Sequence, residues 1–313
     1  MGMQVKLGIG FIEMPLSTAS AFWRWVDLCE HGGIDSIWQS DRLISKRPML
    51  ECMSAMAAIA GATRQIKFGM SVASVGLREP VLLAKQCATI DMLSEGRLLP
   101  AFGIGNPLSP DWKGTGTPTE ARGARTDEAL DIIKALWTGE TLDFDGRFYK
   151  LQGASISPLP VQKKLPFWMG GSSPAMIRRT ARIGTGWLGG RETPEKAGQV
   201  IRAIKQACAD AGRSIDADHY GASFNYRFGR PEEPIVSDYL ERAAARFPNR
   251  DPRDSLVVGD APALLERVRE FAAQGVSKFV LRPVGADDDD ILAQTRRMVD
   301  ELLPAVQGLE AVG

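Results

Sequence analysis

Short apolar segments with the character of β-strands alternate with segments of helical periodicity along the whole chain. Parallel strands in one sheet need a crossover of about a dozen residues or more, and the spacings here allow a helix in each crossover. An eight-fold alternation in 313 residues favours a closed (β/α)8 TIM barrel over an open doubly wound sheet. We therefore expect an α/β fold in a single domain, residues 1–313. The strands are expected at Val5–Phe11, Ser36–Gln39, Ile66–Ser74, Leu98–Phe102, Phe167–Met169, Trp187–Leu188, Tyr220–Phe228 and Lys278–Leu281.

Helical periodicity is clearest where five apolar residues fall at i, i+3, i+4, i+7 and i+8: Ala129, Ile132, Ile133, Leu136 and Trp137. Ser17 is expected to cap the first helix, which runs to about Glu30, and Ile291–Leu303 is expected to form the last. The other helices are predicted at Met49–Thr63, Pro80–Ser94, Pro174–Arg182, Val200–Cys208 and Leu264–Ala272.

Three segments are predicted as loop insertions of the barrel. Asp145-Gly146-Arg147 lies between two short apolar runs and indicates a β-hairpin. The proline-rich segment Gly229–Ser255 is expected to carry one helix, near Ser237–Arg246. Pro107–Thr119 shows no regular pattern, and it is a candidate lid over the carboxyl-terminal face of the barrel.

A dinucleotide-binding fold would show a glycine fingerprint directly after its first strand. Gly8-Ile9-Gly10 lies inside the first strand, and no third glycine follows at the required spacing. The sequence therefore argues against an open Rossmann sheet.

The charge and the histidine content exclude several classes of function. Lys and Arg total 38 and Asp and Glu total 38, so no electrostatic argument supports a nucleic-acid or anionic-membrane partner. The two histidines, His31 and His219, make a histidine-rich metal site or a Ser/His/Asp hydrolase improbable, and the four cysteines form no CxxC pair. We expect no metal, no membrane span and no secretory leader, hence a cytoplasmic protein whose difficult chemistry comes from a bound cofactor.

In a barrel the reactive groups lie at the carboxyl ends of the strands. In Gly170-Gly171-Ser172-Ser173-Pro174, two glycines and two hydroxyls precede a helix start, which suits a phosphate group. The alternative is an ordinary strand-to-helix turn with a serine cap, and the pattern alone does not choose. The other strand ends deliver Glu13, Ser40 and Asp41, Ser71 to Ser74, Gly103 to Asn106, and Gly189 to Arg191.

Three of these strand-end features also have two interpretations. Gly103-Ile104-Gly105-Asn106 suits a flat ring lying against a glycine-lined strand, or it is a loop departure that needs positive φ. Asp41 is a partly buried acid, or it is a cap or ion-pair partner. Trp38, Trp168 and Trp187 wall an aromatic pocket or pack in the core.

Several ordered motifs resemble the luciferase-like flavin-dependent oxidoreductases, from Lys6 to about Pro304. The most informative is Arg78-Glu79-Pro80-x4-Lys85-Gln86-x3-Ile90-Asp91-x-Leu93-Ser94-x-Gly96-Arg97. The others are Ser40-Asp41, Glu128-Ala129-Leu130 with Leu136-Trp137, Gly146-x-Phe148-Tyr149, Pro158-x-Pro160-x-Gln162, Gly170-Gly171 and Gly186-Trp187.

The resemblance implies a (β/α)8 barrel that binds FMN, or the related 8-hydroxy-5-deazaflavin, at the carboxyl ends of its strands. By position, Ser71-Val72 falls where many members have a non-proline cis peptide under the flavin ring, next to Ala73. The loop Gly170, Gly171, Ser172 and Ser173 matches the phosphate loop, and Gly189 and Gly190 match its neighbour. Asp41, Gly103, Gly105 and Asn106 are expected to border the ring.

Two positions depart from the deazaflavin-dependent sugar-phosphate dehydrogenases of that family. Those enzymes have a histidine where this chain has Arg42, and a glutamate where it has Asn106. The usual acid/base pair of that subfamily is therefore missing, although other deazaflavin users are not excluded.

The resemblance implies a monooxygenase-type oxidoreductase that uses reduced FMN and O2 on a small organic substrate. A separate flavin reductase or NAD(P)H is expected to supply the electrons. Two alternatives stay open: hydride transfer with coenzyme F420, a deazaflavin, and a catalytically inactive flavin-binding protein. Asp41, Asn106 and Glu13 are the candidate catalytic residues, with Asp41 preferred, and a homodimer through the second and third helices is expected.

Overall fold

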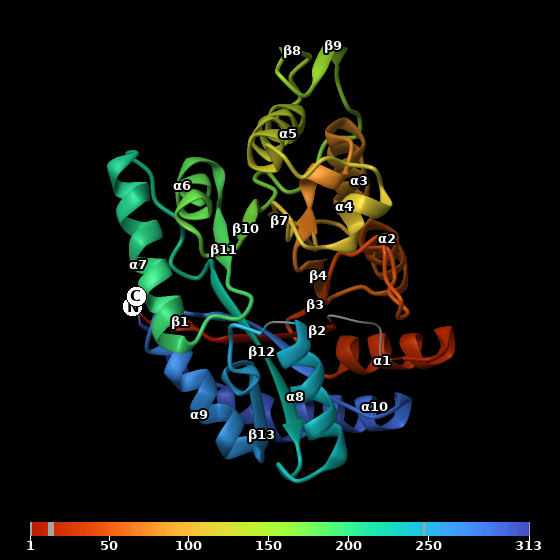
Figure 1. Cartoon of the computed structure of the whole chain (residues 1–313), viewed down its shortest axis with the longest axis vertical. Coiled ribbons are helices and arrows are strands. Elements are labelled where there is room, and N and C mark those ends of the chain that lie inside the picture. The colour runs from red at the N-terminus through yellow and green to blue at the C-terminus, as the bar shows by residue number, and fades with distance from the viewer. Residues whose placement is uncertain (1, 12–15, 247, 313) are drawn as a thin grey trace.

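The computed structural model describes residues 2–11, 16–246 and 248–312. Its centre is a parallel sheet that curls round on itself, with helices on the outside (Figure 1). In hydrogen-bonded order its strands are β5 (Ala73–Ser74), β7 (Ala101–Gly103), β10 (Trp168–Gly170), β11 (Gly186–Leu188), β12 (Tyr220–Phe228), β14 (Lys278–Pro283), β2 (Lys6–Phe11), β3 (Ser36–Gln39), β4 (Lys67–Met70) and β6 (Leu98–Leu99).

Two predicted strands are each divided in two. Ile66–Ser74 becomes β4 and β5 because the chain turns through a cis peptide at Ser71-Val72. Leu98–Phe102 becomes β6 and β7 around Pro100, which has no N–H to donate to a ladder. β4 pairs with β6 and β5 pairs with β7, so the two divided segments lie side by side.

Helices follow the strands as predicted, and several begin at a proline. Proline suits this position because an N–H there would have no acceptor within the helix. They are α1 (Ala19–His31), α2 (Cys52–Ala62), α3 (Pro80–Leu93), α5 (Arg122–Trp137), α6 (Pro174–Ile183), α7 (Pro194–Asp210), α9 (Ala261–Ala272) and α10 (Asp288–Arg297).

The first and last elements of the chain differ in detail from the prediction. Thr18, not Ser17, caps α1: its hydroxyl accepts from Ala21 N at 3.1 Å, whereas Ser17 donates to Asp288. The predicted last helix Ile291–Leu303 is present, but it is not α-helical throughout, because the π-helical turn η3 (Met298–Leu302) separates α10 from α11 (Leu303–Val306). The pair β1 (Met3–Gln4) and β15 (Glu310–Ala311), too short to show a period, joins the two ends of the chain (Figure 1).

The three predicted insertions are present with more structure than expected. The hairpin is β8 (Leu142–Asp145) with β9 (Lys150–Ala154), and it projects beyond α5 (Figure 1). The second insertion contains α8 (Pro234–Arg246) and the 3-10 turn η2 (Pro252–Ser255). It leads into β13 (Leu256–Gly259), an unpredicted strand that pairs with β12. The candidate lid is not irregular, since it contains α4 (Pro110–Gly114) with Trp112 only 2% exposed.

The main core lies between the sheet and the helices, and a smaller cluster fills the space inside the curl. This cluster contains Trp38 and Trp168, whose rings are 6.4 Å apart, with Ala101, Leu188 and Val280. Its position favours core packing over an aromatic pocket for these tryptophans, and Val72 packs on it. The buried cluster therefore forms a floor under the cis peptide. Within the part of the chain that the structure covers, no helix is long and apolar enough to cross a membrane.

Candidate active site at the carboxyl ends of the strands

The predicted site residues of β3, β5, β7, β10 and β11 all come to one end of the sheet, because the strands are parallel and in register. Ser74 pairs with Gly103, and Gly170 pairs with Leu188, one residue before Gly189. Glu13 lies outside the described residues. Neither histidine is at this end of the sheet. His31 is the last residue of α1, and His219 precedes β12, where its Nδ1 lies 2.9 Å from the carbonyl oxygen of Thr185.

The expected cis peptide is present between Ser71 and Val72. The Val72 side chain packs directly over two glycines of neighbouring strands. A Cβ on Gly103 would lie 2.7 Å from Val72 Cγ2, and one on Gly170 would lie 2.8 Å from Val72 Cγ1. Both glycines therefore leave room for the Val72 side chain, and it is Val72 that forms the surface on which a flat ring could rest.

Asp41 is held in a buried hydrogen-bond network next to the segment that follows the cis peptide. Its side chain is 2% exposed, and Oδ2 accepts from Ser74 N at 2.8 Å while Oδ1 accepts from Arg78 Nη2 at 2.6 Å. Both oxygens are engaged by chain groups, so Asp41 fixes the backbone after the cis peptide. A role as general base would require it to leave these partners.

Arg78 also occupies the middle of a set of potential metal ligands. One ligand atom each of Asp41, Glu51 and Cys52 lies within 4.8 Å of the other two. Arg78 Nη2 is 2.6 Å from Asp41, 2.9 Å from Glu51 and 3.4 Å from Cys52 Sγ. Burial raises the pKa of the Cys52 thiol well above its ordinary value. The guanidinium already supplies the positive charge here, and the thiol is not prepared as a ligand.

The predicted phosphate loop leads into α6. Ser173 caps that helix by accepting from Met176 N at 3.3 Å, and Gly171 has φ +111°, a backbone conformation that L side chains rarely adopt. Trp187 Nε1 donates to the Gly171 carbonyl at 2.8 Å and fixes the turn. In the first turn of α6, Pro174 has no N–H, and Met176 N and Ile177 N donate to Ser173. The Ala175 N–H and the serine hydroxyls are therefore the donors that this loop could offer to an anion.

The neighbouring loop, which follows β11, already binds a carboxylate of the same chain. The Glu192 carboxylate accepts from Gly190 N at 2.8 Å and from Arg191 N at 3.0 Å. Ser223 donates to the carbonyls of Gly189 and Gly190. These amides suit an anion, but a ligand phosphate would have to displace Glu192 to use them.

Asn106 serves the candidate lid. Its Oδ1 accepts from Leu108 N at 3.0 Å, and its carbonyl accepts from Trp112 Nε1 at 2.8 Å. Asp111 on α4 in turn accepts from Leu43 N and Ile44 N, in the loop after β3. Asn106 is therefore placed to hold the lid at the rim.

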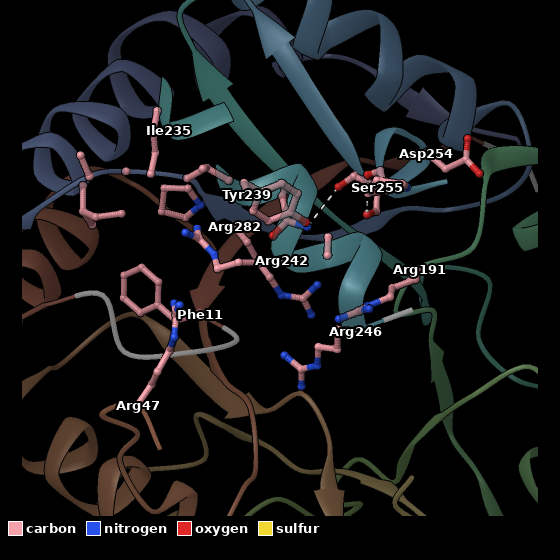
Figure 2. A pocket seen from close by; sticks show the side chains of 18 of the residues that line it. Phe11, Arg47, Arg191, Ile235, Tyr239, Arg242, Arg246, Asp254, Ser255 and Arg282 are labelled. Carbon is pink, nitrogen blue, oxygen red and sulfur yellow. Dashed lines mark hydrogen bonds between the residues drawn. The ribbon is translucent and has the colours of Figure 1, made fainter. Parts of the chain in front are cut away.

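A cavity opens beside the cis peptide, between α8 and the ends of β2, β12 and β14, and its volume is about 510 Å3 (Figure 2). Its most unusual feature is its arginines, which the strand-end argument missed except for Arg191. One signal was available: Arg242 and Arg246 are one helical turn apart in the predicted inserted helix. The arginines that line it are Arg47, Arg191, Arg242, Arg246, Arg250 and Arg282.

A curled parallel sheet with helices outside it, and with a cis peptide and a glycine-rich loop at one end, defines an α/β fold. The model of the luciferase-like monooxygenase family matches residues 11–241. The chain belongs to this luciferase-like family, as its motifs predicted.

Sequence relatives include an F420-dependent glucose-6-phosphate dehydrogenase from Nocardia farcinica. It is 28% identical over 316 residues, which cover 90% of this chain and 92% of that protein. Two solved structures share the fold. One is an F420-dependent secondary alcohol dehydrogenase, with TM-score 0.83 and 17% identity over 97% of this chain and 99% of that one. The other is a monooxygenase from Streptomyces bottropensis, with TM-score 0.83 and 18% identity over 96% and 99%.

Proposed function

We propose that this protein is a coenzyme F420-dependent oxidoreductase that transfers hydride between the cofactor and a small substrate. The observation that carries the proposal is the match to an F420-dependent dehydrogenase over 90% of this chain. The relatives thus favour F420, the alternative considered from the sequence, over the FMN, O2, NAD(P)H and flavin reductase that were expected first. A single-domain (β/α)8 barrel, a homodimer and a cytoplasmic location remain predictions.

The residues present suit a tricyclic cofactor with an anionic side chain. Val72, raised by the cis peptide over Gly103 and Gly170, offers an apolar seat for a ring. Gly171 to Ser173 and the N-terminus of α6 offer N–H and hydroxyl donors for a phosphate. Ser71, Ala73 and Gly105 would complete the wall, and Gly189 and Gly190 would lie near the side chain of the cofactor. F420, when bound, supplies a carrier for one hydride ion.

In this proposal the protein's residues bind the cofactor, orient it and shield it from water. Asp41 acts as a positioning residue, because both its oxygens hold Ser74 N and Arg78. Asn106 borders the ring and holds the lid through Leu108 and Trp112. Since Arg42 and Asn106 replace the histidine and glutamate of the sugar-phosphate dehydrogenases, the proton is handled differently from that subfamily. Glu13 stays a candidate for that role.

A second candidate is an FMN-dependent monooxygenase, which the family description and the fold of the Streptomyces bottropensis enzyme favour. Titration of the purified protein with F420 and, separately, with FMN under nitrogen discriminates the two. We expect F420 to bind at least about tenfold more tightly. Tighter binding of FMN would support the monooxygenase instead, and binding of neither would contradict both. Tight binding without turnover of any substrate would support the inactive flavin-binding protein.

A further inference from the structure

Arg282 on β14 points into the curled sheet, beyond the buried cluster that contains the tryptophans. Val280, two residues before it, belongs to that cluster, and side chains two positions apart on a strand point to the same side. Arg282 is 6% exposed, and burial lowers the pKa of Arg282 to about 10, so the guanidinium keeps its charge and its donors at neutral pH. A buried guanidinium needs hydrogen-bond acceptors. The groups that accept from Arg282 therefore indicate its role.

The two terminal nitrogens of Arg282 donate to two different serines. Nη1 lies 3.0 Å from Ser223 Oγ, and Nη2 lies 3.3 Å from Ser71 Oγ. Ser223 is on the neighbouring strand β12, whereas Ser71 is on the amino side of the cis peptide, after β4. β2 and β3 lie between β14 and β4 in the sheet, so this side chain crosses the inside of the curl.

Ser223 continues the connection to the loop after β11. Its hydroxyl lies 3.1 Å from the carbonyl oxygen of Gly189 and 2.9 Å from that of Gly190. A serine hydroxyl has one hydrogen to donate and lone pairs that accept, so Ser223 accepts from Arg282 while it donates to this loop. Ser223 is 2% exposed and is not among the described residues that line the cavity. It therefore affects a bound molecule through the groups that it holds.

The two ends of this network are the two sides of the proposed cofactor site. At one end is Ser71, which begins the cis peptide that raises Val72 as the ring seat. At the other end are Gly189 and Gly190, which are proposed to lie near the side chain of the cofactor. A planar guanidinium donates in fixed directions, and hydrogen bonds from a charged donor are stronger than neutral ones. Arg282 thereby keeps the two segments at a fixed separation.

We propose that Arg282 is a positioning residue of the cofactor site, which sets the separation of the Ser71-Val72 seat and the Gly189-Gly190 loop through its bonds to Ser71 and Ser223. This proposal rests on the proposed function, because it takes the cofactor to bind between these two segments. A ring and its side chain are bound together only where both segments are correctly spaced. A spacing that is set before binding strengthens the binding of the cofactor.

The test is absorbance titration of the purified full chain with F420 and, separately, with FMN under nitrogen, with a thermal melt of every variant. Ser223→Ala removes one buried hydroxyl that does not line the cavity. Arg282→Met removes both bonds, and Arg282→Lys keeps the charge but not the planar pair of donors. Ser223→Ala is also combined with each Arg282 variant. The combination with Arg282→Lys keeps the test decisive if Arg282→Met does not fold.

Two controls match these changes away from the site. Ser94→Ala removes a hydroxyl that is likewise buried and donates to the Asp91 carbonyl at 3.1 Å, at the end of α3. Arg213→Met removes a guanidinium that donates to the carbonyls of Ala181, in the last turn of α6, and Gly184, which precedes β11. Both controls lose hydrogen bonds at the amino-terminal side of the sheet, so they report on folding alone.

We expect Ser223→Ala to weaken cofactor binding at least about threefold and Arg282→Met at least about tenfold. Arg282→Lys should recover only part of this loss, because an ammonium group does not hold both serines in the geometry of the guanidinium. Ser223→Ala should have a smaller effect in either Arg282 variant than in wild type, since the two residues act through one network. Ser94→Ala and Arg213→Met should bind the cofactor like wild type, even where their Tm is lower.

Wild-type cofactor affinity in Ser223→Ala and Arg282→Lys would overturn the proposal, and a lower Tm without a change in affinity would assign the network to folding alone. An effect of Ser223→Ala that is equal in all backgrounds would also overturn it, because the serine would then act without Arg282. If wild type binds FMN and not F420, the proposed function is contradicted, and the positioning role is decided by the same variants with FMN. Binding of neither cofactor by wild type would overturn both.

Discussion

Arg282 on β14 donates a hydrogen bond to Ser71 Oγ at 3.3 Å, and Ser71 begins the cis peptide that raises Val72. This bond joins two features that are 211 positions apart in the chain. One is the proposed seat of the cofactor ring, and the other is the arginine-lined cavity. A single side chain therefore links the two.

The packing of Val72 on two glycines predicts the effect of a single methyl group. Gly170→Ala would place Cβ 2.8 Å from Val72 Cγ1 and 3.0 Å from Cγ2. We expect it to lower the free energy of unfolding by about 1–3 kcal/mol, as overpacking does. We also expect F420 affinity to fall about tenfold, because Val72 must move. Thermal melts and cofactor titration measure the two effects.

The control for this change is Gly61→Ala on α2, since nothing lies within 4 Å of a Cβ there and φ is not positive. Adding Val72→Ala to Gly170→Ala should restore the free energy of unfolding in part, because the two methyl groups that clash are then removed. Wild-type F420 affinity in Gly170→Ala would show that Val72 does not set the surface of the ring seat.

The conformation of Gly171 predicts a local effect on cofactor binding. With φ +111°, Gly171→Val is strained by about 1–3 kcal/mol and displaces the loop before α6. F420 binding should be lost. Gly212→Ala is the matched control: φ is +65° and no atom lies within 4 Å, so it carries strain without touching the site. Equal F420 affinities in the two variants would refute the assignment of the phosphate loop.

Substitution of Asp41 shows whether this residue positions the backbone or acts as a general base. Asp41→Asn removes the charge opposite Arg78, and breaking a buried pair in this way costs about 3–5 kcal/mol. We expect a lower Tm and weaker F420 binding, with the shape of the pH–rate profile unchanged. Asp145→Asn, at an 86% exposed side chain, is the control. Loss of one limb of the pH–rate profile in Asp41→Asn, with F420 affinity retained, would instead identify a general base.

Glu30 gives a prediction for the dependence of stability on pH. Its carboxylate accepts the backbone N–H groups of Arg64, Gln65 and Ile66 at 2.6, 3.0 and 2.9 Å. Burial raises the pKa of Glu30, but these three donors outweigh burial and lower it below its ordinary value. A lowered folded-state pKa means that the stabilisation is present above the unfolded-state pKa, about 4.3. It is lost as pH falls through the folded-state pKa.

Glu30→Gln should therefore lower the free energy of unfolding at pH ~7 by about 1 kcal/mol, a value that allows for solvent exposure. The gap to wild type should shrink as the pH approaches ~3. Urea denaturation at both pH values measures it, with Glu266→Gln on α9 as the control. A gap that is constant or larger in acid would contradict the assignment.

The sequence predicted the elements better than the site. Strand–helix alternation and apolar periodicity predicted the order of strands and helices, and Tyr220–Phe228 was predicted with the bounds of β12. The break between β4 and β5 was not predicted, and the cis peptide at Ser71-Val72 was expected only from family resemblance, because no local pattern marks it. Pro100 marked the break in the next strand, but a proline alone does not say whether a strand ends or divides.

Partners distant in sequence explain what was missed. Asp41 was preferred as a catalytic acid because the pattern could not show that Arg78, 37 positions later, would bind it. Arg282 was missed because the strand-end residues were taken only from the first six predicted strands, whereas Arg282 lies at the carboxyl end of β14.

In the proposed function, F420 carries the hydride and O2 takes no part. The most direct measurement follows F420 absorbance and O2 uptake together, in closed cuvettes with and without air, while phosphorylated and neutral alcohols and carbonyl compounds are supplied. We expect one F420 to be converted for each substrate molecule, at the same rate with and without O2. Turnover that requires reduced FMN and consumes O2 would contradict it.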